Sequence, residues 1–237
     1  MSPWLLFITA WSAFAAAAPL SGEAHFAAAG ALMPGAEPPA VLSTLSHAAA
    51  ACALVFVGRS SFRETSIIPI AVGLAGAELL RWLSADVRGS VLTIAVGVLG
   101  TAAMLLALGV APRNVAKHSA LREVALAATT LALAGAPGAS PVACALAARA
   151  WSGRRIPAQG AALWAAPLEA RAAWGAGSFS LQGTSALEVG VCAVLAVAGA
   201  AMGARLLRVG PERVGRIGAA YLSIFGAALL AYAYALR

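Results

Sequence analysis

The chain has 237 residues, of which 61% are hydrophobic and only 11% are charged, and its formal net charge is +7. A soluble globular domain is about 45–50% apolar and about 25% charged, so this composition excludes an ordinary soluble protein. The basic residues fall between apolar runs, which is typical of loops facing anionic lipid and does not predict binding of nucleic acid.

Eight apolar runs predict membrane helices, since a spanning helix needs about 20 such residues. They cover residues 3–20, 39–57, 66–83, 89–111, 121–136, 156–174, 185–207 and 214–235. Two shorter runs, 25–33 and 140–150, each follow a Pro/Gly break, and we expect both to be re-entrant. The sequence therefore predicts an all-α polytopic membrane protein with about six full spans and two re-entrant helical hairpins, in one transmembrane domain (1–237).

The distribution of basic residues predicts the orientation. Twelve of the 16 Lys and Arg residues fall in loops on one side of this arrangement, and the positive-inside rule places that side in the cytoplasm. Both termini then face outward. No Lys or Arg precedes Arg59, so the apolar start does not resemble a signal peptide, which has a basic n-region. The hairpins enter from opposite faces, which predicts an inverted repeat with approximate halves 1–111 and 112–237.

The first break reads "APLSGEAH", Ala18–His25, and places Ser21, Glu23 and His25 within an apolar region. An ionisable residue at membrane depth is energetically expensive, so this pattern indicates a polar cavity or a functional site. Glu23 and His25 would face the same way on an extended segment but not on a helix.

The second break contains "PGAS", Pro137–Ser140, and its proline lies 118 residues after Pro19. A turn with free backbone N–H groups at the start of a short helix suits a phosphate. Glycine and serine allow backbone and hydroxyl donors to converge on its oxygens.

Other ionisable residues lie inside the apolar runs. Glu78 and Arg81 have the spacing of a helical i,i+3 ion pair near the outer interface, and the alternative is that Glu78 lines a substrate path. We expect Glu169 and Arg171 to be interfacial. His47 is interpreted as a packing or cavity residue.

Several segments together resemble the undecaprenyl pyrophosphate phosphatase, or bacitracin-resistance, family. "SAFAAAAPLSGEAH" is similar to its signature E-x-x-x-E-F-L-P-[IV]-S-S-T-G-H, so Pro19, Ser21 and His25 fall on the family's proline, first serine and histidine. "PGASPV", Pro137–Val142, looks like the signature P-G-x-S-R-S. Weaker likenesses follow in the family's order at Leu45–Phe62, Ala161–Pro167 and Arg216–Leu230.

The resemblance implies a protein of the bacterial inner membrane that acts on polyprenyl (di)phosphate in the recycling of the cell-wall lipid carrier. It also implies inverted repeats with opposed re-entrant loops, and a divalent cation such as Mg²⁺ or Ca²⁺. The usual cation ligands are absent, because the family's acidic pair falls on Ser12 and Ala16. The family's arginine falls on Pro141. No Cys or His spacing predicts a metal site.

Two functions remain open. In an active hydrolase the catalytic residues would be Ser21, Glu23 and His25, with His25 as the acid/base or nucleophile and Glu23 assisting it. Arg149 could supply the missing positive charge only if its short helix folds back toward the site. The residues expected to bind phosphate are Ser21, Gly138, Ala139 and Ser140. The alternative is a non-catalytic polyprenyl-phosphate binder or flippase-like carrier, since opposed hairpins suit alternating access. The small-residue spacing of Gly199 and Gly203 predicts close helix contact, and such faces permit a homodimer.

Overall fold

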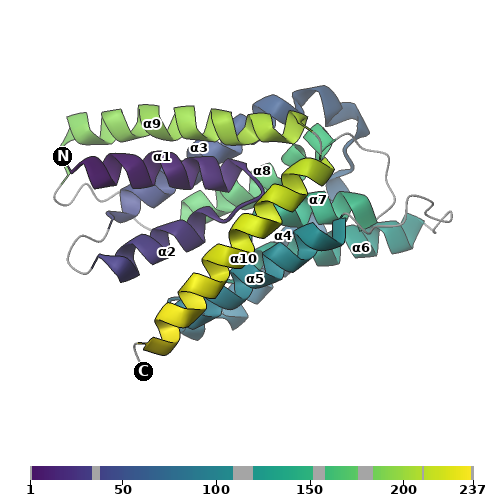
Figure 1. Ribbon diagram of the computed structural model, residues 1–237. Helices are drawn as coiled ribbons and strands as arrows, with labels where there is room; N and C mark the ends of the chain where they lie inside the picture. Colours follow the sequence, from purple (N-terminus) through teal and green to yellow (C-terminus); the bar gives the residue numbers. More distant parts are fainter. Residues whose placement is uncertain are drawn as a thin grey trace.

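The computed structural model describes residues 2–33, 38–108, 120–151, 158–175, 184–209 and 211–235. All regular structure in these ranges is helical (Figure 1). The α-helices are α1 Pro3–Ala17, α2 Gly22–Leu32, α3 Ala40–Gly58, α4 Ile67–Leu83, α5 Val91–Leu108, α6 Ala120–Ala132, α7 Pro141–Trp151, α8 Ala158–Gly175, α9 Ala186–Arg205 and α10 Pro211–Ala235. The 3₁₀ helices are η1 Arg59–Glu64, η2 Ala85–Val87, η3 Leu133–Gly135 and η4 Leu206–Arg208.

Helix length and hydropathy assign the chain to the membrane. Among the described helices, four are long and apolar enough to span a bilayer, over Ala40–Arg63, Val91–Leu108, Ala186–Arg208 and Arg213–Ala235. Large apolar side chains point outward from the bundle; Trp82 and Ile224 are each 74% exposed. Lipid tails solvate such side chains, whereas water would not.

The series of helices repeats along the chain. In α1–α5 the second helix is the shortest, with 11 residues, and the three helices after it are longer than the first. The same order of lengths is found in α6–α10, where α7 has 11 residues. The α1–α2 and α6–α7 hairpins lie toward opposite ends of the molecule (Figure 1). Their turns reach a common interior, because Leu20 and Ala24 of the first hairpin share one hydrophobic cluster with Ala143 of the second.

Each hairpin turn is covered by the last helix of the other half. A Cβ atom on Gly97 of α5 would overlap the Pro137 carbonyl oxygen, so α5 lies directly on the second turn. At the matching place on α10, a Cβ atom on Gly218 would lie 3.6 Å from the Pro19 carbonyl oxygen. The two halves are therefore interlocked rather than packed side by side.

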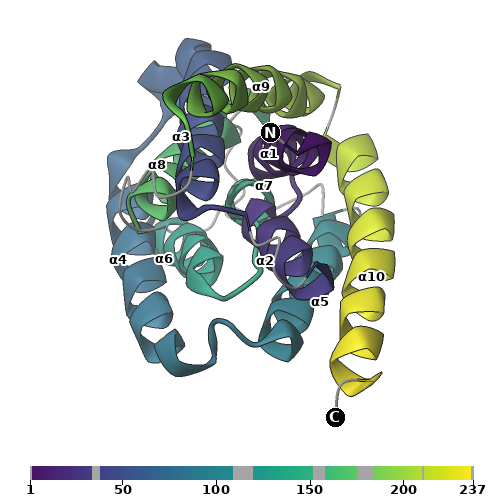
Figure 2. The same ribbon diagram turned by 90° about the vertical axis from the view of Figure 1, so that its left-hand side faces the viewer.

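Small residues make this close packing possible. Residues 142–148 of α7 are all buried, and Figure 2 shows α7 inside the ring formed by the longer helices. The backbone of α1 lies against Gly199 and Gly203 of α9, where an added Cβ would overlap the carbonyl oxygens of Ala10 and Phe14. The predicted close contact at Gly199–Gly203 is thus confirmed.

Candidate functional site

His25 is enclosed by aromatic side chains. Its Nδ1 donates to the Ser21 carbonyl, so Nε2 is an acceptor. It accepts a hydrogen bond from the Tyr221 hydroxyl at 2.6 Å. The ring stacks on Phe225 with centroids 4.6 Å apart, and it meets the Trp11 ring in a T-shaped arrangement. Only 4% of His25 is exposed. Both ring nitrogens are therefore already engaged within the protein.

The two serines expected to bind phosphate both act as helix caps. Ser21 Oγ accepts the Ala24 N–H at the start of α2, and Ser140 Oγ accepts the Ala143 N–H at the start of α7, both at 3.2 Å. Both serines are buried. Such a bond satisfies one of the unpaired N–H groups of the first helical turn, so the hydroxyls have a structural role at both turns.

The backbone of the second turn is also engaged. The Ala139 N–H donates to the Ala136 carbonyl at 3.1 Å, and the Ser140 N–H donates to Thr101 Oγ1 at 3.2 Å. Gly138 has φ +75°, the left-handed region that glycine adopts readily, and its Cα faces the backbone of Ile94. The N–H groups of Ala139 and Ser140 therefore already have partners.

Glu23 and His25 point in different directions. Because α2 begins at Gly22, both residues are helical, and side chains two positions apart lie about 200° apart around the axis. Glu23 instead bonds Arg88, with the guanidinium 3.0 and 3.1 Å from its two oxygens. The geometry does not bring Ser21, Glu23 and His25 together around one point. Arg149 lies in the last turn of α7, about 12 Å along the helix from its start.

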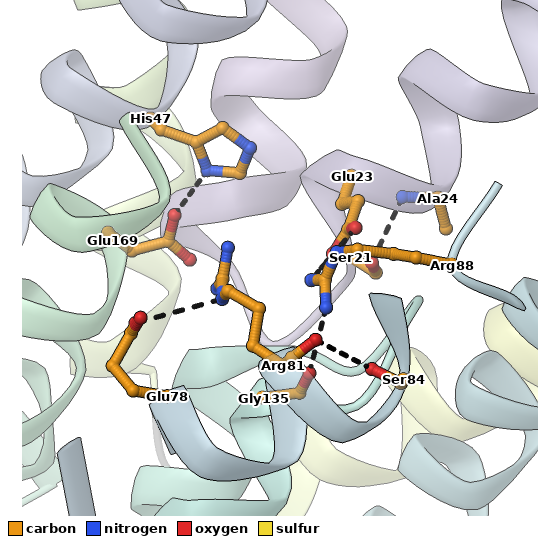
Figure 3. Close-up of polar contacts among 10 residues, drawn as sticks. All are labelled: Ser21, Glu23, Ala24, His47, Glu78, Arg81, Ser84, Arg88, Gly135 and Glu169. Carbon is orange, nitrogen blue, oxygen red and sulfur yellow. Dashed lines mark hydrogen bonds and ion pairs between the residues drawn. The ribbon is translucent and has the colours of Figure 1, made fainter. Parts of the chain in front are cut away.

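Arg88 connects the two hairpins. It follows η2 in the connection between α4 and α5, and it binds Glu23 of the first hairpin. It also donates to the carbonyl oxygen of Gly135, beside the turn of the second hairpin, at 3.0 Å. One guanidinium therefore holds both hairpins, as Figure 3 shows.

A second group of charges joins α4 to α8. Arg171 donates to Glu78 at 2.7 Å, and Arg81 Nε lies 3.8 Å from the other oxygen of Glu78. The predicted proximity of Glu78 and Arg81 is confirmed, but the shorter bond is made by Arg171. Each of the three side chains is partly buried, with 22–35% exposed.

His47 and Glu169 form a buried pair between α3 and α8. Their closest atoms, His47 Nδ1 and Glu169 Oε2, are 2.6 Å apart, and the side chains are 7% and 0% exposed. The carboxylate of Glu169 is fully enclosed by the protein, and its depth at the membrane interface stays a prediction. The interpretation of His47 as a cavity or packing residue is refined, since it has a specific acidic partner.

These contacts define a charged cluster contributed by α2, α3, α4, α8 and the α4–α5 connection. Its members are Glu23, His47, Glu78, Arg81, Arg88, Glu169 and Arg171. Figure 3 shows the guanidinium groups of Arg81 and Arg88 turned toward the space between the His47–Glu169 pair and Glu23. Exposure increases from Glu169, which is fully buried, to Glu78, so the cluster has a closed end and an open end.

Four buried polar atoms of this cluster have no hydrogen-bond partner: Glu78 Oε1, Arg81 Nε, Glu169 Oε1 and Arg171 Nη1. An unpaired buried polar group costs about 1–3 kcal/mol, and more when it is charged. Two donors and two acceptors left unpaired together indicate a place that a polar ligand or water fills.

The Glu23–Arg88 pair lies in a groove of about 630 Å³ between α2 and α5. The remaining walls are largely apolar and include Phe26, Val91 and Ile94. The groove therefore offers a charged site and an apolar surface to the same molecule.

A divalent cation fits these residues poorly. The positions of the family's acidic pair hold Ser12 and Ala16, and the nearby carboxylate of Glu23 is occupied by Arg88. The described residues contain no group of three or more His, Cys, Asp or Glu side chains arranged to hold a metal ion. We therefore assign no role to a metal at this site.

No protein-family model matches the chain, and no curated protein matches it either.

The sequence interpretation missed Arg88 and the partnership of His47 with Glu169. One signal was present: Glu169 lies in an alanine-rich run with alanine at positions 165, 166, 172 and 173, so it has no ionic partner one turn away. A carboxylate at membrane depth without a local partner must find one on another helix, and His47 is in the same situation.

Proposed function

We propose that this protein is a non-catalytic carrier of polyprenyl phosphate lipids in the bacterial inner membrane. In this proposal it has the topology of the undecaprenyl pyrophosphate phosphatase family, with about six spanning helices, two re-entrant hairpins, an inverted repeat and both termini outside. The observation that carries the proposal is Arg88, which holds both hairpins at the edge of a groove suited to a phosphate head and an apolar chain.

The charges of the cluster suit a phosphate. Arg81 Nε and Arg171 Nη1 are buried donors without a hydrogen-bond partner, and charge-assisted bonds from guanidinium to phosphate are about twice as strong as neutral ones. A phosphate that displaced Glu23 from Arg88 would also loosen the link between the hairpins. Binding would then favour the rearrangement that alternating access requires.

The carrier explains the first turn better than a hydrolase does. Hydrolysis needs a nucleophile or activated water beside an acid/base group. Here His25 bonds Ser21 and Tyr221, and Glu23 bonds Arg88. Holding and moving a phosphate requires donors but no acid/base pair.

The test is reconstitution of the purified protein in liposomes with a fluorescent polyprenyl phosphate whose movement between leaflets is followed. We expect movement above that in empty liposomes, and no phosphate release from undecaprenyl pyrophosphate with or without Mg²⁺. Arg88→Gln should weaken binding of the polyprenyl phosphate about tenfold or more, since a hydrogen bond to a charged group contributes about 1.5–3 kcal/mol.

Arg59→Gln is the matched control, because Arg59 lies over the Phe56 ring in η1, outside the cluster. Equal losses in both variants would point to a general effect of net charge. Phosphate release by the wild type that is lost in His25→Ala would contradict the carrier function and support the hydrolase instead.

A further inference from the structure

The charged cluster contains one group that can change its net charge near neutral pH. Its three carboxylates and three guanidinium groups cancel while His47 is neutral. Arginine stays charged, whereas histidine has an unperturbed pKa of about 6.5 and titrates between about pH 5 and 8. Protonation of His47 therefore gives the cluster a charge of +1.

A phosphate entering the cluster brings at least one negative charge into a site with limited access to water. Coulomb interactions are strong in such an environment, because the effective dielectric constant is lower than in water. The most favourable way to accept the anion is to accept a proton at the same time. By linkage, the proton must then strengthen phosphate binding by the same factor.

The geometry of His47 allows this uptake. Nδ1 donates to Glu169 Oε2, so the proton adds to the lone pair of Nε2 and leaves an imidazolium beside the carboxylate. In Figure 3 this second ring nitrogen is turned away from Glu169, on the side where Glu23 lies. The proton comes from water at the open part of the cluster, where 35% of the Glu78 side chain and 33% of the Glu23 side chain are exposed.

Within the part of the chain that the structure describes, the charged side chains that act on His47 all belong to the same cluster. Glu169 is on α8, Glu23 on α2 and Arg81 on α4, and each interacts electrostatically with His47. Glu169 Oε1 is fully buried without a partner, so the pair is not a closed structural contact. A purely structural pair would be expected to satisfy both carboxylate oxygens.

We propose that the His47–Glu169 pair is a proton-binding site coupled to phosphate binding, so that the carrier takes up one proton with each phosphate head group. This inference rests on the proposed function, and it adds an energy source: a proton gradient would drive the lipid in one direction.

The test uses the methyl diester of geranyl phosphate, because its single negative charge does not change over the pH range in which histidine titrates. Binding to the detergent-purified full chain is measured between about pH 5 and 8. We expect the dissociation constant to rise with pH, approaching tenfold per pH unit, as for one linked proton. His47→Gln should remove this dependence. His25→Gln should keep it, since His25 lies in the aromatic enclosure instead.

Calorimetry of the wild type in two buffers of different ionisation enthalpy gives the number of protons taken up per ligand, and it needs no variant. One proton is expected. Binding with no proton uptake, or with a pH dependence that survives His47→Gln in folded protein, would overturn the coupling and leave the carrier intact. If neither the diester nor geranyl phosphate binds at any pH, the proposed carrier function itself is contradicted.

Discussion

After Ser21 at the first hairpin turn come Glu23 and His25, whereas the matching positions after Ser140 hold Val142 and Cys144. The serine caps are alike, with the same bond to the third residue of an 11-residue helix. The cap is therefore part of the fold at both turns, and the ionisable side chains are an addition to one of them. A serine that matches a catalytic signature need not be evidence of catalysis.

The turns also differ in how tightly they are covered. The second turn lies against α5 with no space at Gly97, whereas the first has room at Gly218. We regard the second turn as an anchor and the first as the turn that carries polar chemistry. Three variants or pairs of variants test this difference.

The largest effect is expected from Gly97→Ala compared with Gly218→Ala. The added methyl at position 97 would overlap the Pro137 carbonyl oxygen, so we expect a loss of about 3 kcal/mol in the free energy of unfolding. At position 218 the nearest atom is the flexible Leu105 Cδ1 at 3.1 Å, and we expect a change within about 1 kcal/mol. Thermal unfolding in detergent measures both. Equal shifts in melting temperature would mean that the turns are equally constrained.

A smaller effect is expected from His25→Phe. The new ring keeps the stack on Phe225 but removes the side-chain bonds to the Ser21 carbonyl and the Tyr221 hydroxyl. The Ser21 carbonyl still accepts the N–H of residue 25, so the main loss is the partner of Tyr221. We expect a loss of about 2 kcal/mol, since unpaired buried groups cost about 1–3 kcal/mol. Cys144→Ala, at the matching position of α7, is the control and should cost less. A larger loss in the cysteine variant would contradict a special role for the first turn.

The smallest effects should come from Ser21→Ala and Ser140→Ala. Each removes one cap, which is worth about 1 kcal/mol. We expect the two losses to be similar, and the double variant to show their sum if the turns are independent. A deficit from additivity would show instead that the turns are coupled through the shared hydrophobic cluster.

Much of the helical arrangement was predictable. Pro19 and Pro137 with their neighbouring Gly and Ser residues mark both turns, because these residues end helices and begin new ones. The structure has α2 and α7 at residues 22–32 and 141–151, against predicted runs at 25–33 and 140–150. The predicted run 3–20 is shorter as a helix, since α1 ends at Ala17 where the turn begins. The span count, the re-entrant placement and the orientation remain predictions.

The candidate site was much less predictable. The three-residue earlier start of α2 decides that Glu23 and His25 diverge, and helix ends are the least certain part of any sequence interpretation. The His47–Glu169 contact joins positions 122 residues apart, and Arg88 reaches Gly135 across 47 residues. Local sequence patterns contain no information on contacts between residues so far apart in the chain. The only indication of these contacts was that buried charges need partners.

The interlocking of the two halves has a consequence for biosynthesis. The hydroxyl that bonds His25 belongs to Tyr221, 196 residues later, on the helix that follows all the other described ones. During translation the first hairpin is made early, yet its covering helix leaves the ribosome after the rest of the bundle. Until then His25 must be shielded by lipid, by water or by the insertion machinery. The polar turn of the nascent chain is therefore incomplete until α10 is inserted and covers it.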